Sequence, residues 1–224
     1  MNKYIIWDMD GTLVNGEKIS EEAFYYACGL YDILIPPNFK FESGLSDYLK
    51  LESIGLKKSK SIEIVQAMDE YYIKNINSNF IVNGAIELIN FFEEEGYRQI
   101  CVSNSDRIKL NANLNLSNAF DKLIFSLSAN DVVHPKPDKE IYNKAMTYAG
   151  ITNELVIAIE DSETGCNAAL SAGVKLLCLN NIKLTNHPNY QNSKPQSCLE
   201  EIYTYRHKIF NQYKLRNIFK QALR

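Results

Sequence analysis

The segment KYIIWDMDGTL, residues 3–13, gives the first indication of the fold of this chain. It opens with an apolar run that ends at the carboxylate of Asp8, a pattern typical of a buried β-strand. Period-two geometry places Asp8 and Asp10 on the same side at the carboxyl end of that strand. Gly11 allows a sharp turn there, and Thr12 offers a hydroxyl to tie the turn. We therefore expect two close carboxylates at the edge where open α/β sheets bind ligands.

Strand-like and helical segments alternate from residue 84 onward. Strands separated by helices of this length indicate right-handed βαβ crossovers, and hence an α/β fold with a Rossmann-like parallel sheet. Pro137 stands at the first turn of one predicted helix, a position that proline favours. The expected strands are residues 3–8, 99–103, 122–126, 155–159 and 175–179, and the expected helices are residues 84–95, 106–114, 137–149 and 163–172.

The segment from residue 16 to residue 82 interrupts this alternation with helical spacing only. Its two predicted helices cover residues 20–31 and 59–76, and the second carries an apolar stripe that we interpret as core packing. Asn-Gly pairs at residues 15–16 and 83–84 bracket the segment, either as hinges or as ordinary turns. We predict that this segment is a helical cap inserted into the core. The stripe consists of Ile62, Val65, Met68, Tyr72 and Ile76.

The C-terminal end differs in charge from the rest of the chain. Residues 204–224 contain six basic residues and no acidic one, with apolar residues interspersed. This pattern predicts a basic, partly amphipathic helix, which packs on the protein's own acidic surface or contacts an anionic partner. The predicted organisation is a Rossmann-like catalytic core of residues 1–15 and 83–203, a helical cap of residues 16–82, and this basic C-terminal helix.

The composition excludes several classes of protein. Of the 224 residues, 46% are hydrophobic and 23% are charged, and the net charge is −3. No nucleic-acid partner is expected, because such binding needs a basic surface. No apolar run reaches the roughly 18–20 residues of a membrane span. The five cysteines are odd in number and form no C-x-x-C pair, so we expect buried, reduced thiols and a cytoplasmic location.

Three further strand ends carry polar side chains. Glu160 and Asp161 follow the predicted strand of residues 155–159, and in a parallel sheet they would meet the first two aspartates at one edge. A cluster of hard oxygen ligands suits Mg²⁺ better than zinc. Ser103-Asn104-Ser105 ends another strand with groups that can bind phosphate oxygens. Lys136 lies between two prolines, where its charge can pair with both a phosphate and a carboxylate.

With these motifs in this order, the sequence resembles the haloacid-dehalogenase-like superfamily, in its phosphatase and β-phosphoglucomutase-like branch with a helical cap. The resemblance covers roughly residues 3–180. The matching motifs are DMDGTL (residues 8–13), SNS (residues 103–105), KPDKEIY (residues 136–142) and EDSETG (residues 160–165).

The resemblance implies a role for each residue of the site. Asp8 would attack phosphorus as the nucleophile and form an aspartyl-phosphate. Asp10 would protonate the leaving oxygen and then accept a proton from the attacking water. Mg²⁺ would be held by the side chain of Asp8, the backbone carbonyl of Asp10 and Asp161, with Glu160 as a further ligand or as a neighbour of the ligands. The phosphoryl group would be bound by Ser103, Asn104 and Lys136.

We therefore predict a Mg²⁺-dependent phosphatase that hydrolyses a small phosphorylated metabolite. A β-phosphoglucomutase-like mutase is the alternative. Mutases of this type carry a threonine and a histidine in the first linker, where Gly16 and Ser20 stand here, and this departure favours hydrolysis. A phospho-accepting module would place an adjacent acidic pair on its first strand. Here the adjacent pair is Glu160-Asp161, which follows a later strand. A scaffold that acts through its basic tail is also compatible with the sequence.

Substrate choice in this family is a property of the cap. The loop of residues 41–46 falls where a cap loop enters the active site. The nearby lysines could contact an anionic substrate, but a lysine-rich run is more often a solvated face, and we favour that interpretation. They are Lys50, Lys57, Lys58 and Lys60.

Overall fold

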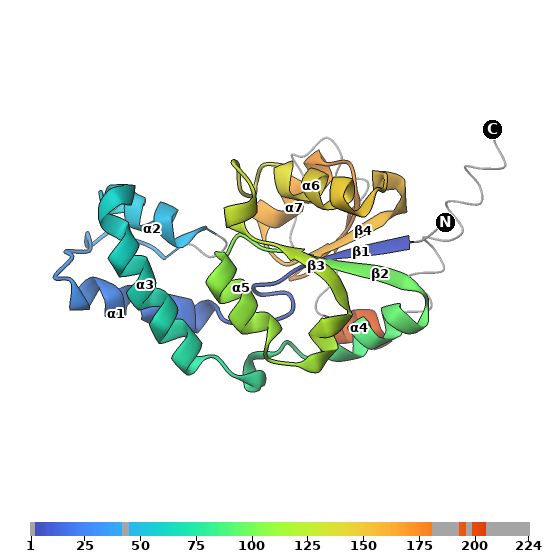
Figure 1. The fold of residues 1–224 in the computed structure, drawn as a ribbon, viewed down its shortest axis with the longest axis horizontal. Coiled ribbons are helices and arrows are strands. Elements are labelled where there is room, and N and C mark those ends of the chain that lie inside the picture. Colours follow the sequence, from blue (N-terminus) through green and yellow to red (C-terminus); the bar gives the residue numbers. More distant parts are fainter. Residues whose placement is uncertain (1–2, 42–44, 181–192, 196–198, 205–224) are drawn as a thin grey trace.

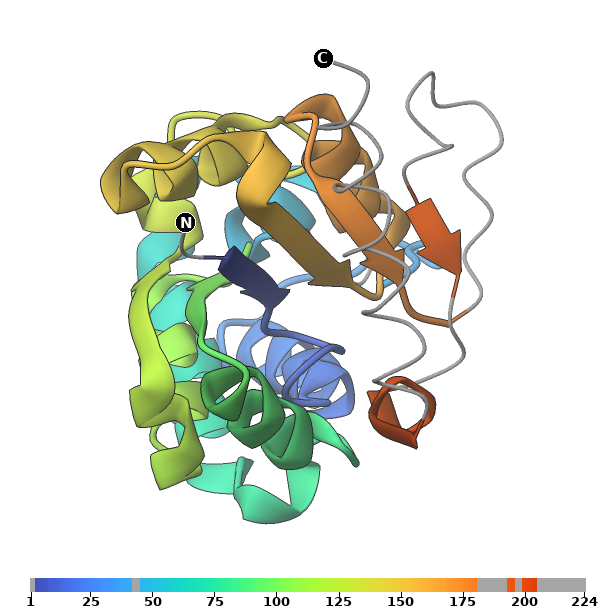
Figure 2. The same ribbon diagram turned by 90° about the vertical axis from the view of Figure 1, so that its right-hand side faces the viewer.

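The computed structural model is built on one parallel β-sheet, with helices on both of its faces (Figures 1 and 2). It describes residues 3–41, 45–180, 193–195 and 199–204. The strands follow the order β3-β2-β1-β4-β5-β6 across the sheet, so β1 is central. The predicted α/β class and Rossmann-like parallel sheet are confirmed. The strands are β1 (Lys3–Asp8), β2 (Tyr97–Val102), β3 (Leu123–Leu127), β4 (Val156–Glu160), β5 (Lys175–Cys178) and β6 (Ser193–Pro195).

Alternation along β1 divides the core into two layers. Ile5 and Trp7 belong to the apolar cluster on one face of the sheet, and Tyr4 and Ile6 to the cluster on the other. The helices α4 and α8 contribute to the first cluster, and α6 and α7 to the second. These helices are α4 (Ala85–Glu94), α6 (Glu140–Ala149), α7 (Glu163–Ser171) and α8 (Leu199–Thr204), and α5 (Arg107–Leu114) follows β2. Short 3₁₀ turns are η1 (Ser78–Phe80), η2 (Asn118–Lys122), η3 (Ala129–Asp131) and η4 (Asn153–Leu155).

Three helices lie beside the sheet, to the left in Figure 1, and we call them the cap helices: α1 (Glu17–Leu30), α2 (Asp47–Ser53) and α3 (Lys58–Asn75). They share an apolar cluster of their own. α2 was not predicted, because it is a short helix of seven residues without a periodic stripe. The exact division into core and cap stays a prediction from the sequence.

The predicted stripe on α3 is correct except at its first position. Val65, Met68, Tyr72 and Ile76 are buried, whereas Ile62 is 51% exposed. In the first turns of the helix Ser61 and Ile64 are the buried residues, so the inner face there passes through them and not through Ile62. The helix is therefore buried along its inner face from the start, and the predicted stripe was misplaced at one residue.

The helix predicted from residue 137 begins at Glu140 instead. A cis peptide bond joins Lys136 to Pro137, and the chain makes a turn before α6 starts. The carboxylate of Glu140 accepts hydrogen bonds from the backbone N–H groups of Val133 and His134, at 2.9 and 2.8 Å. Pro137 is thus part of the loop that carries Lys136, and not of the helix.

Four cysteines lie in the described residues, and all four are buried, as their apolar setting predicted. They are Cys28, Cys101, Cys166 and Cys178. Within the described part of the chain, no helix combines the length and apolarity that crossing a membrane requires. The predicted basic helix falls on residues 204–224, of which all but Thr204 lie outside the described residues.

Candidate active site

The turn after β1 brings the first motif against the fourth. Met9 accepts backbone hydrogen bonds from Leu13 and Val14, at 2.8 and 3.0 Å, which closes the turn. Gly11 has φ +86°, and a Cβ at this position would lie 2.0 Å from Oδ2 of Asp161. Glycine is required here both by the backbone angle and by the close approach of that carboxylate. The hydroxyl of Thr12 donates to Oδ1 of Asp161 at 3.2 Å, rather than tying its own turn as predicted.

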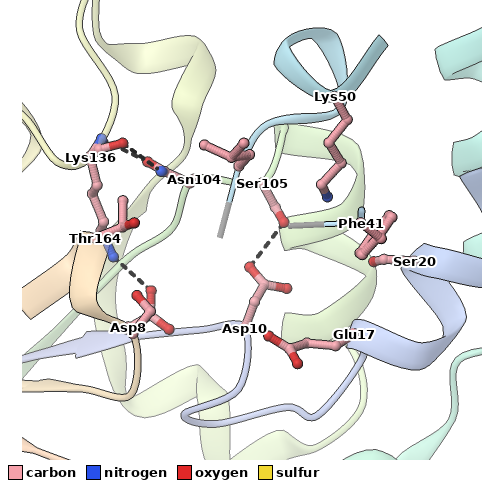
Figure 3. Close-up of a pocket in the computed structure, with 12 residues that line it drawn as sticks. Asp8, Asp10, Glu17, Ser20, Phe41, Lys50, Asn104, Ser105, Lys136 and Thr164 are labelled. Carbon is pink, nitrogen blue, oxygen red and sulfur yellow. Dashed lines mark hydrogen bonds and ion pairs between the residues drawn. The ribbon is translucent and has the colours of Figure 1, made fainter. Parts of the chain in front are cut away.

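Lys136 links the carboxylates at the ends of two neighbouring strands. Its Nζ donates to Oδ1 of Asp8 at 2.6 Å, to Oε1 of Glu160 at 2.7 Å and to the carbonyl of Val102 at 3.1 Å. The side chain of Asn104 holds the lysine's backbone through two hydrogen bonds, one accepted at Oδ1 (2.9 Å) and one donated from Nδ2 (3.0 Å) (Figure 3). Asn104 therefore positions Lys136, which is only 3% exposed.

Charge and burial oppose each other in this site. Burial raises the pKa of Asp8 well above its usual value, and the neighbouring carboxylates, Glu160 foremost, raise it further, while Lys136 partly offsets them. The pKa of Asp161 is raised to about 7, first by burial and then by Glu160. Burial lowers the pKa of Lys136, but Asp8 and Glu160 outweigh that effect and raise it. The carboxyl groups of Asp8, Glu160 and Asp161 therefore outnumber the ammonium group of Lys136 that pairs with two of them.

The residues fit a hard divalent cation. Oxygen atoms of Asp8, Glu160 and Asp161 lie within 4.8 Å of one another. Oδ2 of Asp8 and Oε2 of Glu160 are buried and find no hydrogen-bond partner among the described residues. Because a buried carboxylate oxygen without a partner is costly, a bound cation would satisfy both atoms. Gly165 keeps α7 close to this cluster, since a Cβ there would lie 1.9 Å from Oε2 of Glu160.

Asp10 lies beside this cluster, and three donors hold its carboxylate. The hydroxyls of Ser103 and Ser105 donate to Oδ2 at 2.6 and 2.9 Å, and Nδ2 of Asn113 donates to Oδ1 at 3.2 Å. Ser103 is fully buried, whereas Ser105 and Asn104 line the cavity above Asp8. Ser103, predicted as a phosphate ligand, is thus placed against Asp10 in this conformation.

Sequence reasoning assigned no role to several residues of the site. Tyr142 is fully buried on α6 and donates its hydroxyl to Oε1 of Glu160. Ser105 is the last residue of the SNS motif, and the sequence indicated no separate role for it. Asn113 gave no signal at all, because an asparagine inside a predicted helix has no distinctive pattern. Only the folded chain brings these side chains to the carboxylates.

A small cavity opens above Asp8 and Asp10, between the sheet edge and the cap helices (Figure 3). The cap contributes Phe41, Leu45 and Lys50 to its wall, so two of the described residues of the predicted loop line the site. The cavity measures about 50 Å³. That is room for a few water molecules, whereas ligand pockets usually measure roughly 300 Å³ or more.

Lys50 corrects the prediction of a solvated lysine face. It is 6% exposed, and its Nζ pairs with Oδ1 of Asp47 at 3.2 Å and lies 4.4 Å from the ring centroid of Phe41. Lys57 and Lys60 are exposed, as expected. The spacing of these lysines along the chain did not distinguish Lys50, because its burial depends on how α2 packs against the core.

Comparison with known proteins identifies the class to which this fold and site belong. The family model described as haloacid dehalogenase-like hydrolase matches residues 5–179, and the chain therefore belongs to that family. Among curated proteins, it is 27% identical over 191 residues to the phosphorylated carbohydrates phosphatase of Thermotoga maritima, covering 76% of this chain and 82% of that one. It is also 25% identical to the protein SUPPRESSOR OF QUENCHING 1, chloroplastic, of Arabidopsis thaliana, and there it spans only 17% of the relative's length.

Among solved structures, β-phosphoglucomutase from Clostridium difficile aligns with a TM-score of 0.76. The alignment covers 96% of this chain and 100% of that chain at 19% identity, a level that establishes the fold alone. The predicted family, and with it the class of phosphoric monoester hydrolase, is confirmed by the family model and the curated relatives.

Proposed function

We propose that this protein is a Mg²⁺-dependent phosphatase that hydrolyses a small phosphorylated metabolite through an aspartyl-phosphate on Asp8. The observation that carries the proposal is the position of Asp8. Its Oδ1 is paired with Lys136, and its Oδ2 is buried, without a hydrogen-bond partner among the described residues. Asp8 lines the cavity at the end of β1, and its pairing with Lys136 orients the carboxylate for attack on phosphorus.

The first step transfers the phosphoryl group to Asp8. A bond forms between the carboxylate oxygen and phosphorus while the ester P–O bond breaks, and Asp10 gives a proton to the leaving oxygen. Lys136 lies within 2.6 Å of Oδ1 of Asp8 and supplies positive charge beside the phosphoryl oxygens. In the second step water attacks phosphorus, Asp10 takes the water's proton, and the bond to Asp8 breaks to release inorganic phosphate.

Asp8, Asp161 and the backbone carbonyl of Asp10 would hold Mg²⁺, with Glu160 beside them. When bound, this ion supplies positive charge that offsets the repulsion between the phosphate and the carboxylates. The two buried oxygen atoms without partners and the raised pKa of Asp161 support such a site.

The cap limits which substrates reach the site. Because the cavity is only about 50 Å³, the cap helices must move away from the sheet edge to admit a phosphate ester. Once inside, the substrate meets the charge of Lys50 and the ring of Phe41. A small, polar leaving group fits this wall. The cytoplasmic location, which follows from the cysteine pattern, is part of the same proposal.

The test is hydrolysis of p-nitrophenyl phosphate and of a panel of sugar phosphates by the purified full chain. We expect turnover with Mg²⁺, none in EDTA, and none for Asp8→Asn. Asp121→Asn is the matched control, because Asp121 is an exposed aspartate of η2. Full activity of Asp8→Asn would contradict the nucleophile assignment.

The same panel distinguishes the alternatives. Release of free phosphate supports the phosphatase, whereas conversion of one sugar phosphate into its isomer would show a mutase. A long-lived aspartyl-phosphate without turnover would indicate a phospho-accepting module instead. The structural likeness to a β-phosphoglucomutase is a likeness of fold and does not favour the mutase.

A further inference from the structure

A hydrogen-bonded chain leads from the cap to the carboxylate of Asp10. Tyr72 on α3 donates its hydroxyl to Oδ1 of Asn113 on α5, at 2.9 Å. Asn113 in turn donates from Nδ2 to Oδ1 of Asp10, at 3.2 Å. Tyr72 and Asn113 are both fully buried. Two side chains without contact to solvent thus connect a cap helix with the acid–base residue of the proposed reaction.

In this chain of hydrogen bonds, the donor and the acceptor of each bond are fixed. The carboxylate of Asp10 accepts, so the amide nitrogen of Asn113 must face it. The amide oxygen of Asn113 then faces Tyr72, which must donate. Burial, and then the charge of Asp10, raise the pKa of Tyr72, so its hydroxyl keeps its proton throughout the neutral range. Asp10 and Tyr72 thus hold the amide of Asn113 from its two ends.

The linker at the start of the cap makes room for this contact. A Cβ at Gly16 would lie 2.1 Å from the hydroxyl oxygen of Tyr72 and 2.9 Å from its Cζ. The backbone of Gly16 is not in the left-handed region, so its conformation does not demand glycine. Space for the tyrosine hydroxyl is the requirement that the structure shows at this position.

The two oxygens of Asp10 are held from different parts of the molecule. Oδ2 accepts from Ser103 and Ser105, which lie at and just after the end of β2 in the core. Oδ1 accepts from Asn113, whose amide oxygen accepts from Tyr72 on α3. α3 and α5 pack against each other (Figure 1). Moving α3 away would remove the tyrosine hydroxyl, and the amide of Asn113 that donates to Oδ1 would lose the donor on its other side.

We propose that Tyr72 and Asn113 are positioning residues that orient the carboxylate of Asp10 only when the cap is seated on the core. This inference rests on the proposed function, because it assigns the acid–base role to Asp10. It implies that closure of the cap changes the orientation of the Asp10 carboxylate. The change passes through two side chains that contact neither the substrate nor the metal. Proton transfer then becomes efficient only in the closed enzyme.

Tyr72→Phe tests the relay with aryl phosphates whose leaving groups differ in basicity. The variant keeps the ring in place and removes one hydroxyl. Phenol is a poor leaving group that needs its proton early, whereas p-nitrophenol leaves readily without help. We expect kcat/KM to fall about 10-fold or more for phenyl phosphate, since general acid catalysis contributes roughly 10²–10⁴. For p-nitrophenyl phosphate we expect a loss of less than about 3-fold, because little acid assistance is needed there.

Three controls make the result specific. Tyr71→Phe removes a hydroxyl from the next position of α3, where the side chain is only partly buried, and should change neither substrate's rate. Gly16→Ala crowds the Tyr72 hydroxyl without removing it and should reproduce the selective loss, which keeps the test available if Tyr72→Phe folds poorly. In an Asp10→Ala background, Tyr72→Phe should cause no further loss, because its target is already gone.

Each remaining outcome overturns the inference. An equal loss of kcat/KM for both substrates would show that Tyr72 merely supports the fold. Unchanged kcat/KM for both substrates in both Tyr72→Phe and Gly16→Ala would show that Asp10 is oriented without the tyrosine hydroxyl. In these two cases the wild type is active and the proposed function stands. A wild-type chain that hydrolyses no aryl phosphate overturns the proposed function and the relay together.

Discussion

Replacing Lys136 by methionine tests whether the buried charges of the site depend on one ammonium group. Lys136 makes three hydrogen bonds, to Asp8, Glu160 and the carbonyl of Val102, at 2.6, 2.7 and 3.1 Å. Methionine fills a similar volume, so the change removes charge and donors while disturbing the packing little. It leaves two buried carboxylates next to each other without a counter-charge.

Removing one partner of a buried ion pair costs about 3–5 kcal/mol, because the charge left behind stays desolvated. A folded domain is stable by only about 5–15 kcal/mol, so the variant should unfold at a much lower urea concentration. The measurement is urea unfolding followed by circular dichroism at pH 7 in EDTA, so that no divalent cation replaces the ammonium group. Lys60→Met is the matched control, because Lys60 is exposed on α3, and its effect should stay within about 0.5 kcal/mol. A loss below about 1 kcal/mol for Lys136→Met would refute the reasoning, since it would mean that these carboxylates are solvated or protonated already.

Two other predictions concern a buried carboxyl and a close approach. Asp69 is 4% exposed, and its pKa is raised to about 8, first by burial and then by Asp106. Between its ordinary pKa and this one the folded chain binds more protons than the unfolded chain, so stability falls as the pH rises from about 4 to about 8. In Asp69→Asn the free energy of unfolding, measured with urea at pH 5 and pH 8.5, should decrease less between the two pH values than in the wild type. An equal decrease in variant and wild type would contradict the assignment. Gly165→Ala should destabilise by about 1–3 kcal/mol in thermal melting, because its Cβ would lie 1.9 Å from Oε2 of Glu160. Gly29→Ala is its control, since no atom lies within 4 Å of a Cβ there, and it should be neutral or stabilising by up to about 1 kcal/mol.

Five of the six described strands and most helices were predictable because their information is local, and β6 was not among the predicted strands. β1 was predicted with the bounds that the structure has, Lys3–Asp8, since a short apolar run before a carboxylate defines both its interior and its end. The other strands of the predicted set agree within one or two residues. The short helix α2 and the start of α6 at Glu140 were missed. Both depend on capping and loop contacts that periodicity does not record.

The positions of the acidic residues were predictable for the same reason. Each motif follows a strand, and parallel strands end at one edge, so the order of elements alone brings Asp8 and Asp161 together. The partners of individual atoms were not predictable. Tyr142 lies 18 residues from Glu160 in the chain, and nothing in a helical tyrosine indicates that its hydroxyl reaches a carboxylate.

Chain order and side-chain period by themselves determined the sheet, the edge that carries the chemistry and the family to which the chain belongs. Which polar groups form hydrogen bonds with each other, and which side chains are buried, depends on the tertiary structure. Lys50, for example, is buried in the cavity wall, whereas Lys57 is exposed. The tertiary structure likewise placed Tyr72 against Asn113, 41 residues apart in sequence. The physical reason is that backbone geometry repeats with a period that residue types reveal, whereas hydrogen bonds and burial depend on distances that exist only after the cap and the core have packed.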